Sequence, residues 1–316
     1  MIQSQINQDR RELKEDSVAI IVQPITADFA AEVGDVALNR PLSTDDLAAV
    51  RAAFAKYAVL VFPDQEFDDE SQLAFARNFG PLETTVFKAR KDHKLRLHEN
   101  LADVSNLDAE NRILTTTDRQ RLYNLGNQLW HTDSSFKRVP AYCSMLHARS
   151  IPPIGGQTEF ADMRAAYDAL PEATKRRIEG LVAEHSIMTS RAKLGFTDFD
   201  DSEREAFKAV PQVLVRRLQD SSRMSLYMAS HAGSIRGMAD AEARKLLEEL
   251  TEHATQRRFV YAHRWRVKDL VIWDDRCTMH RGMPFDDQRY QRDMRRATVS
   301  DIAPTCEQMG LAVAAE

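Results

Sequence analysis

The sequence predicts a mostly β protein with flanking helices, built as a double-sheet jelly roll. Short strand-like apolar segments recur along most of the chain, as the strands of such a fold do. Only three segments show the periodicity of an amphipathic helix. The chain of 316 residues is long enough to bury a substantial core, and we expect one domain spanning residues 1–316.

The predicted helices have recognisable ends or a clear apolar face. The first begins after Ser43, an expected N-cap, and reaches about Tyr57. The second covers 70–79 and is ended by Gly80. The third covers 239–255 and carries an apolar leucine stripe. The strands are expected, in chain order, at 19–22, 58–62, 141–149, 158–161, 182–188, 212–217, 224–228, 259–265, 270–273 and 294–300.

Composition excludes several classes of function. The net charge of −5 and the pI of about 6.0 argue against a general nucleic-acid binder. Residues 1–17 are polar, with no apolar signal-peptide core, and no apolar run reaches the length of a membrane span. The three cysteines are an odd number without a C-x-x-C pair, which indicates reduced thiols in a cytoplasmic protein.

Two distant segments carry candidate metal ligands. His131 and Asp133 lie two residues apart, and residues so spaced on a strand point to the same side. His280 must then arrive from another strand. Two imidazoles and one carboxylate are the facial triad of non-haem Fe(II) oxygenases, and they leave coordination positions open. The alternative for His131 is a histidine satisfied by hydrogen bonds in the core.

Two further segments carry candidate anion-binding residues. If 294–300 continues back as a strand, Arg292 and Arg296 lie on one face of it. Inward guanidinium groups are costly unless each meets an anion, and arginine suits carboxylates. Thr158 follows a Gly-Gly turn, and its hydroxyl is able to assist such an arginine. The alternatives are a solvated basic strand and an ordinary hairpin.

Together these segments resemble the taurine dioxygenase superfamily of Fe(II)/2-oxoglutarate-dependent oxygenases. Within it, the chain is most similar to the 2,4-dichlorophenoxyacetate dioxygenase branch. The resemblance runs from about residue 19 to 300 and is densest at 127–170, 253–281 and 292–298. It implies a double-stranded β-helix with a metal inside its open end. It also implies the use of Fe(II), 2-oxoglutarate and O2.

The resemblance assigns roles to the matching positions. His131, Asp133 and His280 match the iron ligands. Arg292 and Thr158 match the pair that binds the distal carboxylate of 2-oxoglutarate.

Other matching positions face the substrate. Arg296 is implied to bind the acid group of the primary substrate, and Asn127 to line its pocket. Trp130 and Trp273 are expected to form walls of the site. Lys88 is the best candidate for a further substrate contact, on the ground of its charge in the basic segment 84–125 and not of the resemblance.

The implied reaction hydroxylates an aliphatic carbon and releases succinate and CO2. The expected substrate is a small organic anion, an aryl or aryloxy carboxylate whose ether would be cleaved. A sulfonate, as in taurine-type enzymes, is the alternative, because Arg296 suits either anion. A non-catalytic jelly-roll binding protein and a zinc hydrolase are less consistent with Arg292 and Thr158. We expect a homo-oligomer.

The segment 84–125 is polar, weakly periodic and rich in basic residues. We expect it to be a lid over the active site, with a solvated loop as the alternative. For His231 we expect a structural role, with lining of the substrate pocket as the alternative. His147, His185, His253 and His263 are assigned structural roles, because nothing in the sequence pairs them with other ligands.

Overall fold

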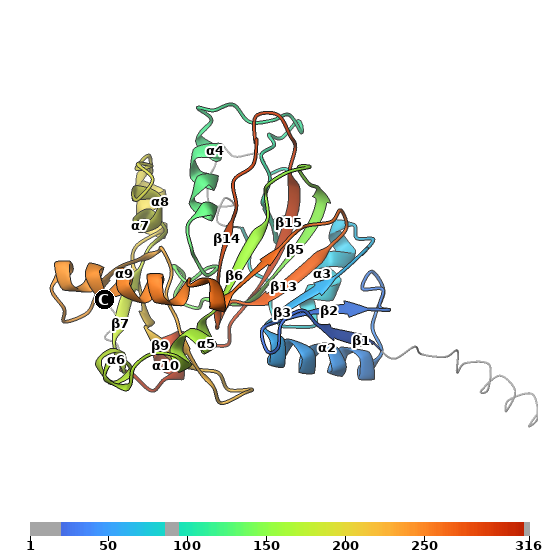
Figure 1. Ribbon diagram of the computed structural model, residues 1–316. Coiled ribbons are helices and arrows are strands. Elements are labelled where there is room, and N and C mark those ends of the chain that lie inside the picture. Colours follow the sequence, from blue (N-terminus) through green and yellow to red (C-terminus); the bar gives the residue numbers. More distant parts are fainter. Residues whose placement is uncertain (1–19, 86–94, 313–316) are drawn as a thin grey trace, which may run out of the picture.

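A large sheet dominates the computed structural model, which describes residues 20–85 and 95–312 (Figure 1). It has seven strands in the order β1-β2-β3-β13-β5-β15-β4. Its neighbours pair antiparallel except β2 and β3, which are parallel. The strands are β1 (Ile21–Pro24), β2 (Ala30–Gly34), β3 (Val59–Phe62), β13 (Leu270–Asp274), β5 (Ala141–Ser150), β15 (Asp293–Ser300) and β4 (Leu101–Asp103).

A smaller sheet, ordered β12-β6-β14, packs against the large one. Phe160 of β6 meets Trp273 of β13 with ring centroids 5.4 Å apart, inside an apolar layer shared by both sheets. Two layers of sheet with helices outside them confirm the predicted fold class. The remaining strands are β12 (Val260–His263), β6 (Thr158–Asp162), β14 (Thr278–Gly282), β11 (Ala232–Ile235), β7 (Val182–His185), β8 (Val210–Val213), β10 (Met224–Leu226) and β9 (Val215–Arg217).

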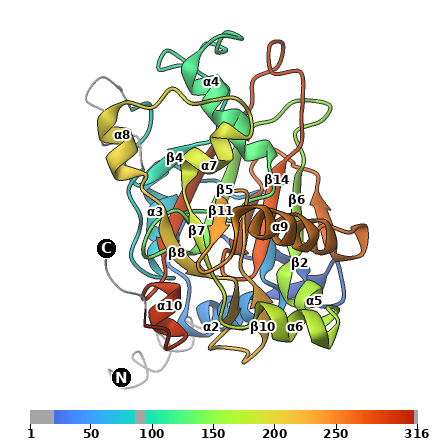
Figure 2. The ribbon, with the colours of Figure 1, turned by 90° about the vertical axis from the view of Figure 1, so that its left-hand side faces the viewer.

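Helices cover the outer faces of both sheets (Figures 1 and 2). In β3, Leu60 and Phe62 face the cluster formed with α2 and α3, whereas Val59 and Val61 face the layer between the sheets. The α-helices are α2 (Thr44–Tyr57), α3 (Asp69–Arg77), α4 (Arg119–Asn124), α5 (Met163–Asp168), α6 (Glu172–Ile178), α7 (Ile187–Ala192), α8 (Asp201–Ala206), α9 (Asp240–Ala254) and α10 (Thr305–Gln308). Short 3₁₀ turns are η2 (Leu125–Gln128) and η3 (Arg257–Phe259).

Several sequence predictions need correction. The strand expected over 182–188 ends at His185, because the Ser186 hydroxyl accepts the Met188 N–H and caps α7. The strand expected over 212–217 is divided into β8 and β9 at Leu214. The segment 84–125 is not a loop throughout: β4 joins the edge of the large sheet, and α4 lies within it.

The histidines assigned to the core have hydrogen-bond partners there. His147 Nε2 donates to the Gln65 carbonyl at 2.8 Å, and His185 Nδ1 lies 3.0 Å from Ser135 Oγ. Burial lowers the pKa of His147 to about 4 and that of His185 to about 3. Both imidazoles are therefore neutral in the folded protein at pH values where an exposed histidine is already protonated.

This difference predicts acid sensitivity. Between about pH 6.5 and the lowered pKa values, the unfolded chain binds protons that the folded chain does not. The free energy of unfolding therefore decreases as the pH is lowered through this range. Between pH 7 and pH 5 we expect a loss of about 2 kcal/mol for each imidazole. Urea unfolding of metal-free protein at both pH values measures it. His185→Gln should show a smaller loss, and an equal loss would contradict the assignment.

The described parts of the chain also show the state of the cysteines and the character of the helices. Cys143, Cys277 and Cys306 are all buried and free. None of the helices placed in these parts combines the length and apolar character needed to cross a bilayer.

Candidate metal centre and its two cavities

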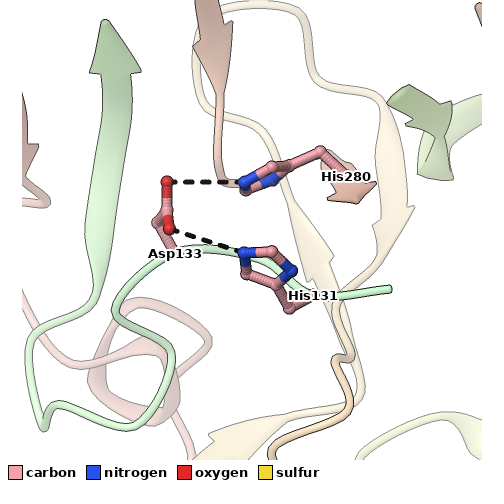
Figure 3. Close-up of side chains that lie close together, drawn as sticks. All are labelled: His131, Asp133 and His280. Atoms are coloured by element: carbon pink, nitrogen blue, oxygen red, sulfur yellow. Dashed lines mark ion pairs between the residues drawn. The ribbon is translucent and has the colours of Figure 1, made fainter. Parts of the chain in front are cut away.

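The side chains of His131, Asp133 and His280 lie close together and point toward one another (Figure 3). One ligand atom from each lies within 4.8 Å of the others. His131 Nε2 is 3.9 Å from one carboxylate oxygen of Asp133, and His280 Nε2 is 3.7 Å from the other. All three residues are buried. The spacing and donor set fit a divalent transition metal bound on one face.

The two histidines are joined through their main chains. His131 N–H donates to the His280 carbonyl at 3.0 Å, and His280 N–H donates to the His131 carbonyl at 2.7 Å. This antiparallel bridge is isolated, so the strand expected at His131 and Asp133 is not formed. Instead, a turn begins at Asp133 and passes through Ser134, whose φ is 52°. Strand β14 supplies His280 from a distant part of the sequence, as expected.

The protonation states suit a metal. Burial lowers the pKa of His131 and of His280, which leaves neutral imidazoles with free lone pairs. Burial alone would raise the pKa of Asp133, but the adjacent Arg296 guanidinium and the hydrogen bond from Ser144 hold the pKa of that carboxyl below its usual value. The triad therefore presents two neutral nitrogens and one carboxylate at neutral pH.

Polar neighbours orient the Asp133 carboxylate and its backbone. Ser144 Oγ donates to Asp133 Oδ2 at 2.8 Å, and Arg296 Nη1 pairs with Asp133 Oδ1. Asp275 Oδ1 accepts the N–H of Asp133 and the indole N–H of Trp273, each at 3.0 Å. Such outer partners fix the direction of a ligand's lone pairs.

Two cavities meet at the triad. The first, the Thr158 cavity, measures about 120 Å³ and is walled by Leu146 and Trp273 as well as Thr158 and Arg292. The second, the Arg191 cavity, measures about 90 Å³. Its walls include Tyr123, Phe136, Ile187, Arg191, Asp133 and His231.

Three of the residues that border both cavities are His131, Asn127 and Arg296. The triad thus lies where two adjoining cavities meet.

The Thr158 cavity contains a buried cation without a counterion. Arg292 lies just before β15, and no carboxylate of the described chain pairs with it. Burial lowers the pKa of Arg292 to about 10, so its guanidinium stays charged at neutral pH. Thr158 faces the same space from β6, and its Oγ1 accepts the indole N–H of Trp265 at 3.0 Å. An anion in this cavity would compensate the arginine.

The other predicted site residues are distributed unevenly. Asn127 of η2 borders both cavities, and Trp273 walls the Thr158 cavity. Trp130 instead packs against the apolar cluster around α5 and α9, with Arg281 over its ring at 4.6 Å, so the expectation that it walls the site is wrong. His231 walls the Arg191 cavity, which was the alternative to the structural role expected for it. Lys88 lies outside the described residues.

Comparison with known proteins identifies the family. Residues 21–298 match the model of the family described as "Taurine catabolism dioxygenase TauD, TfdA family". The chain belongs to this family. Its members include an α-ketoglutarate-dependent 2,4-dichlorophenoxyacetate dioxygenase of Cupriavidus pinatubonensis, which is 44% identical over 286 residues, 90% of this chain and 99% of that protein.

Two further known proteins are similar to this chain over most of its length. The (S)-phenoxypropionate/α-ketoglutarate dioxygenase of Sphingobium herbicidovorans is 38% identical over 278 residues, 85% of this chain and 91% of that protein. The crystal structure of AAD-2 with Mn(II) and N-oxalylglycine superposes with a TM-score of 0.84 at 49% identity, covering 91% of this chain and 99% of that one.

Membership of the TauD/TfdA family confirms the class of enzyme expected from the sequence. It is a dioxygenase whose cofactor and co-substrates are Fe(II), 2-oxoglutarate and O2. The triad geometry and the uncompensated Arg292 agree with that class, because one accounts for a metal and the other for an anion.

Proposed function

We propose that this dioxygenase hydroxylates an aliphatic carbon of a small aryl or aryloxy carboxylate, with ether cleavage when the carbon bears an aryloxy oxygen. The observation that carries the proposal is the position of the triad between two cavities, each with its own guanidinium group. The named activities of the relatives support the aryloxy acid as substrate.

The Thr158 cavity is the proposed place for 2-oxoglutarate. Its distal carboxylate would pair with Arg292, in the geometry that arginine favours for carboxylates. Because Thr158 Oγ1 already accepts a hydrogen bond from Trp265, its own O–H remains available to donate to the same carboxylate. Trp265 is thus a positioning residue for Thr158.

We predict that Trp265→Phe raises the KM for 2-oxoglutarate about three- to tenfold. A typical hydrogen bond contributes about 0.5–1.5 kcal/mol, and here its loss frees the Thr158 hydroxyl to turn. Steady-state kinetics with either substrate varied measures the effect. The KM for the primary substrate should stay constant. A rise confined to the primary substrate would contradict the role of Trp265.

The Arg191 cavity is the proposed place for the primary substrate. Arg296 and Asn127 lie where the two cavities meet, so they are suited to orient the acid group beside the metal. Bound Fe(II) supplies the activation of O2 that accompanies oxidative decarboxylation of 2-oxoglutarate to succinate and CO2. The chain contributes the three metal ligands. Asp133 is held in place because Ser144 Oγ donates to its carboxylate and its own backbone N–H donates to Asp275.

The segment 84–125 is proposed to act as a lid within one domain of 316 residues. Val104 and Asn124 border both cavities, while Asn106 and Arg121 border the Thr158 cavity. Closing over both spaces would exclude water from the reacting groups. A substrate contact by Lys88 belongs to the same proposal.

A homo-oligomer and a cytoplasmic location are also proposed. The three free buried cysteines support a reducing compartment. Sedimentation equilibrium tests the oligomeric state.

The proposed function is tested by succinate formation. Anaerobically purified protein receives Fe(II), 2-oxoglutarate and O2 with aryloxyacetates, aryloxypropionates, arylalkanoates or taurine. We expect succinate to rise with an aryloxy acid and not in His131→Ala. A rise with taurine alone would move the assignment to sulfonates.

A further inference from the structure

Arg191 of α7 is a buried cation whose charge the described chain does not neutralise. The residue is 4% exposed, and no carboxylate of the described residues pairs with it. Nη1 donates to Ser190 Oγ at 3.0 Å, the guanidinium lies 4.4 Å from the centroid of the Tyr123 ring, and Nε has no partner among the described residues. Burying an arginine in this way is costly unless an anion compensates it.

The carboxylates around the Arg191 cavity already have partners. Glu83 pairs with Lys137, and Asp103 pairs with Arg96. Asp133 alone faces Arg296, and it is also the carboxylate of the metal site. When a divalent cation occupies the triad, Asp133 is its ligand, and the single negative charge of Asp133 is then shared between that cation and Arg296. Arg191 has no carboxylate of its own in the cavity.

Close packing determines the position of Arg191. A Cβ added at Gly126 would lie 2.2 Å from Cζ and Nη1 of this arginine, so only glycine leaves room for the guanidinium. Gly126 belongs to η2, which also carries Asn127 at the border of both cavities. Aromatic walls, including Phe136, lie in the same cavity. The space therefore offers cations beside apolar surface, which suits an aryl acid.

We propose that Arg191, together with Arg296, binds the anionic group of the primary substrate. The inference rests on the proposed function and adds a residue that determines specificity for anions. The shared chemistry is a singly charged oxyanion, which a carboxylate, a sulfonate or a sulfate ester would each provide. The guanidinium reaches it from α7, whereas Arg296 reaches it from β15.

The test compares a charged ligand with its neutral analogue. Protein loaded with Mn(II) and 2-oxoglutarate is titrated calorimetrically with 2,4-dichlorophenoxyacetate and with the corresponding amide. In Arg191→Met we expect the Kd for the acid to rise about tenfold or more, because charge-assisted hydrogen bonds are lost. The Kd values for the amide and for 2-oxoglutarate should not change. Arg204→Met, on the exposed face of α8, is the matched control for lost charge.

A second variant keeps the charge but moves it. Gly126→Ala should displace the guanidinium of Arg191. As in Arg191→Met, the Kd for the acid should then rise more than the Kd for the amide. This variant decides the matter if Arg191→Met does not fold. If the Kd values for the acid and the amide rise equally, Arg191 only shapes the wall of the cavity and the proposal is wrong. An unchanged acid Kd in a folded variant also overturns it.

Control titrations separate this proposal from the proposed function. Taurine and hexyl sulfate are titrated into the wild type alongside the aryloxy acid. If one of them binds in place of the acid, the aryl carboxylate assignment fails, and Arg191 is tested with that anion instead. If wild-type protein binds none of the three anions, the proposed function and the role of Arg191 both fall.

Discussion

Replacing His280 with alanine is expected to abolish measurable succinate formation and to weaken Mn(II) binding by more than about 100-fold. The estimate follows because changing an outer partner of a metal ligand already costs about 10- to 100-fold in affinity, and this change removes a ligand. Two of the three ligands, His131 and Asp133, would remain. Calorimetric titration with Mn(II) measures affinity without turnover.

The variant is informative because the fold should survive it. The hydrogen bonds between His131 and His280 use main-chain atoms, so they do not depend on the imidazole. His253→Ala provides a matched control, since that imidazole is bound to the Ala166 carbonyl and borders neither cavity. It should leave Mn(II) affinity unchanged. Tight Mn(II) binding by His280→Ala would show that the metal is held elsewhere.

Arg292 and Arg296 are expected to affect the binding of different substrates. Arg292→Ala should raise the KM for 2-oxoglutarate by about 30-fold to several thousandfold, because truncating one partner of a buried charged pair costs about 2–5 kcal/mol. Arg296→Ala should act mainly on the primary substrate. It should also loosen the metal site, because Arg296 pairs with Asp133. Separate KM values for the two substrates, with the Mn(II) Kd, resolve these effects.

Lysine substitutions sharpen the comparison. Arg292→Lys keeps the charge but loses the planar fork, so partial recovery of 2-oxoglutarate affinity is expected relative to alanine. If Arg292→Ala and Arg296→Ala both weakened only the primary substrate, the division of roles would be wrong. The Thr158 cavity would then have no assigned ligand.

The parts of the fold that can be predicted are those with a signal in the neighbouring sequence. Ser43 caps α2 through the Asp46 N–H, as its position before an amphipathic helix indicated. Strand β2 was missed because its sequence, AAEVG, has no strand-like alternation and becomes extended through pairing with β1 and β3. The end of β7 was also missed, since Ser186 caps a helix that packing, not propensity, stabilises.

The residues of the site also divide into those that stand in sequence motifs and those that do not. His131, Asp133, His280, Arg292 and Thr158 stand in recognisable motifs, and the structure brings them to one place.

Arg191, Trp265 and Asp275 were not identified as site residues, because each reaches the site through tertiary packing. Arg191 lies in a stretch without a motif, and its environment comes from Gly126 and Tyr123 in another segment. Trp265 was predicted only as the end of a strand, and its indole reaches Thr158 across the fold. Spacing along the chain carries no signal for such contacts.

The main-chain bridge between His131 and His280 separates architecture from chemistry in this protein. The backbone holds the two segments together without using these side chains, so the frame of the centre is kept when a ligand side chain is replaced. A substitution at Asp133 would open one coordination position and leave the two imidazoles facing each other as before. The centre is therefore a modular unit, in which selection or design can alter reactivity one side chain at a time.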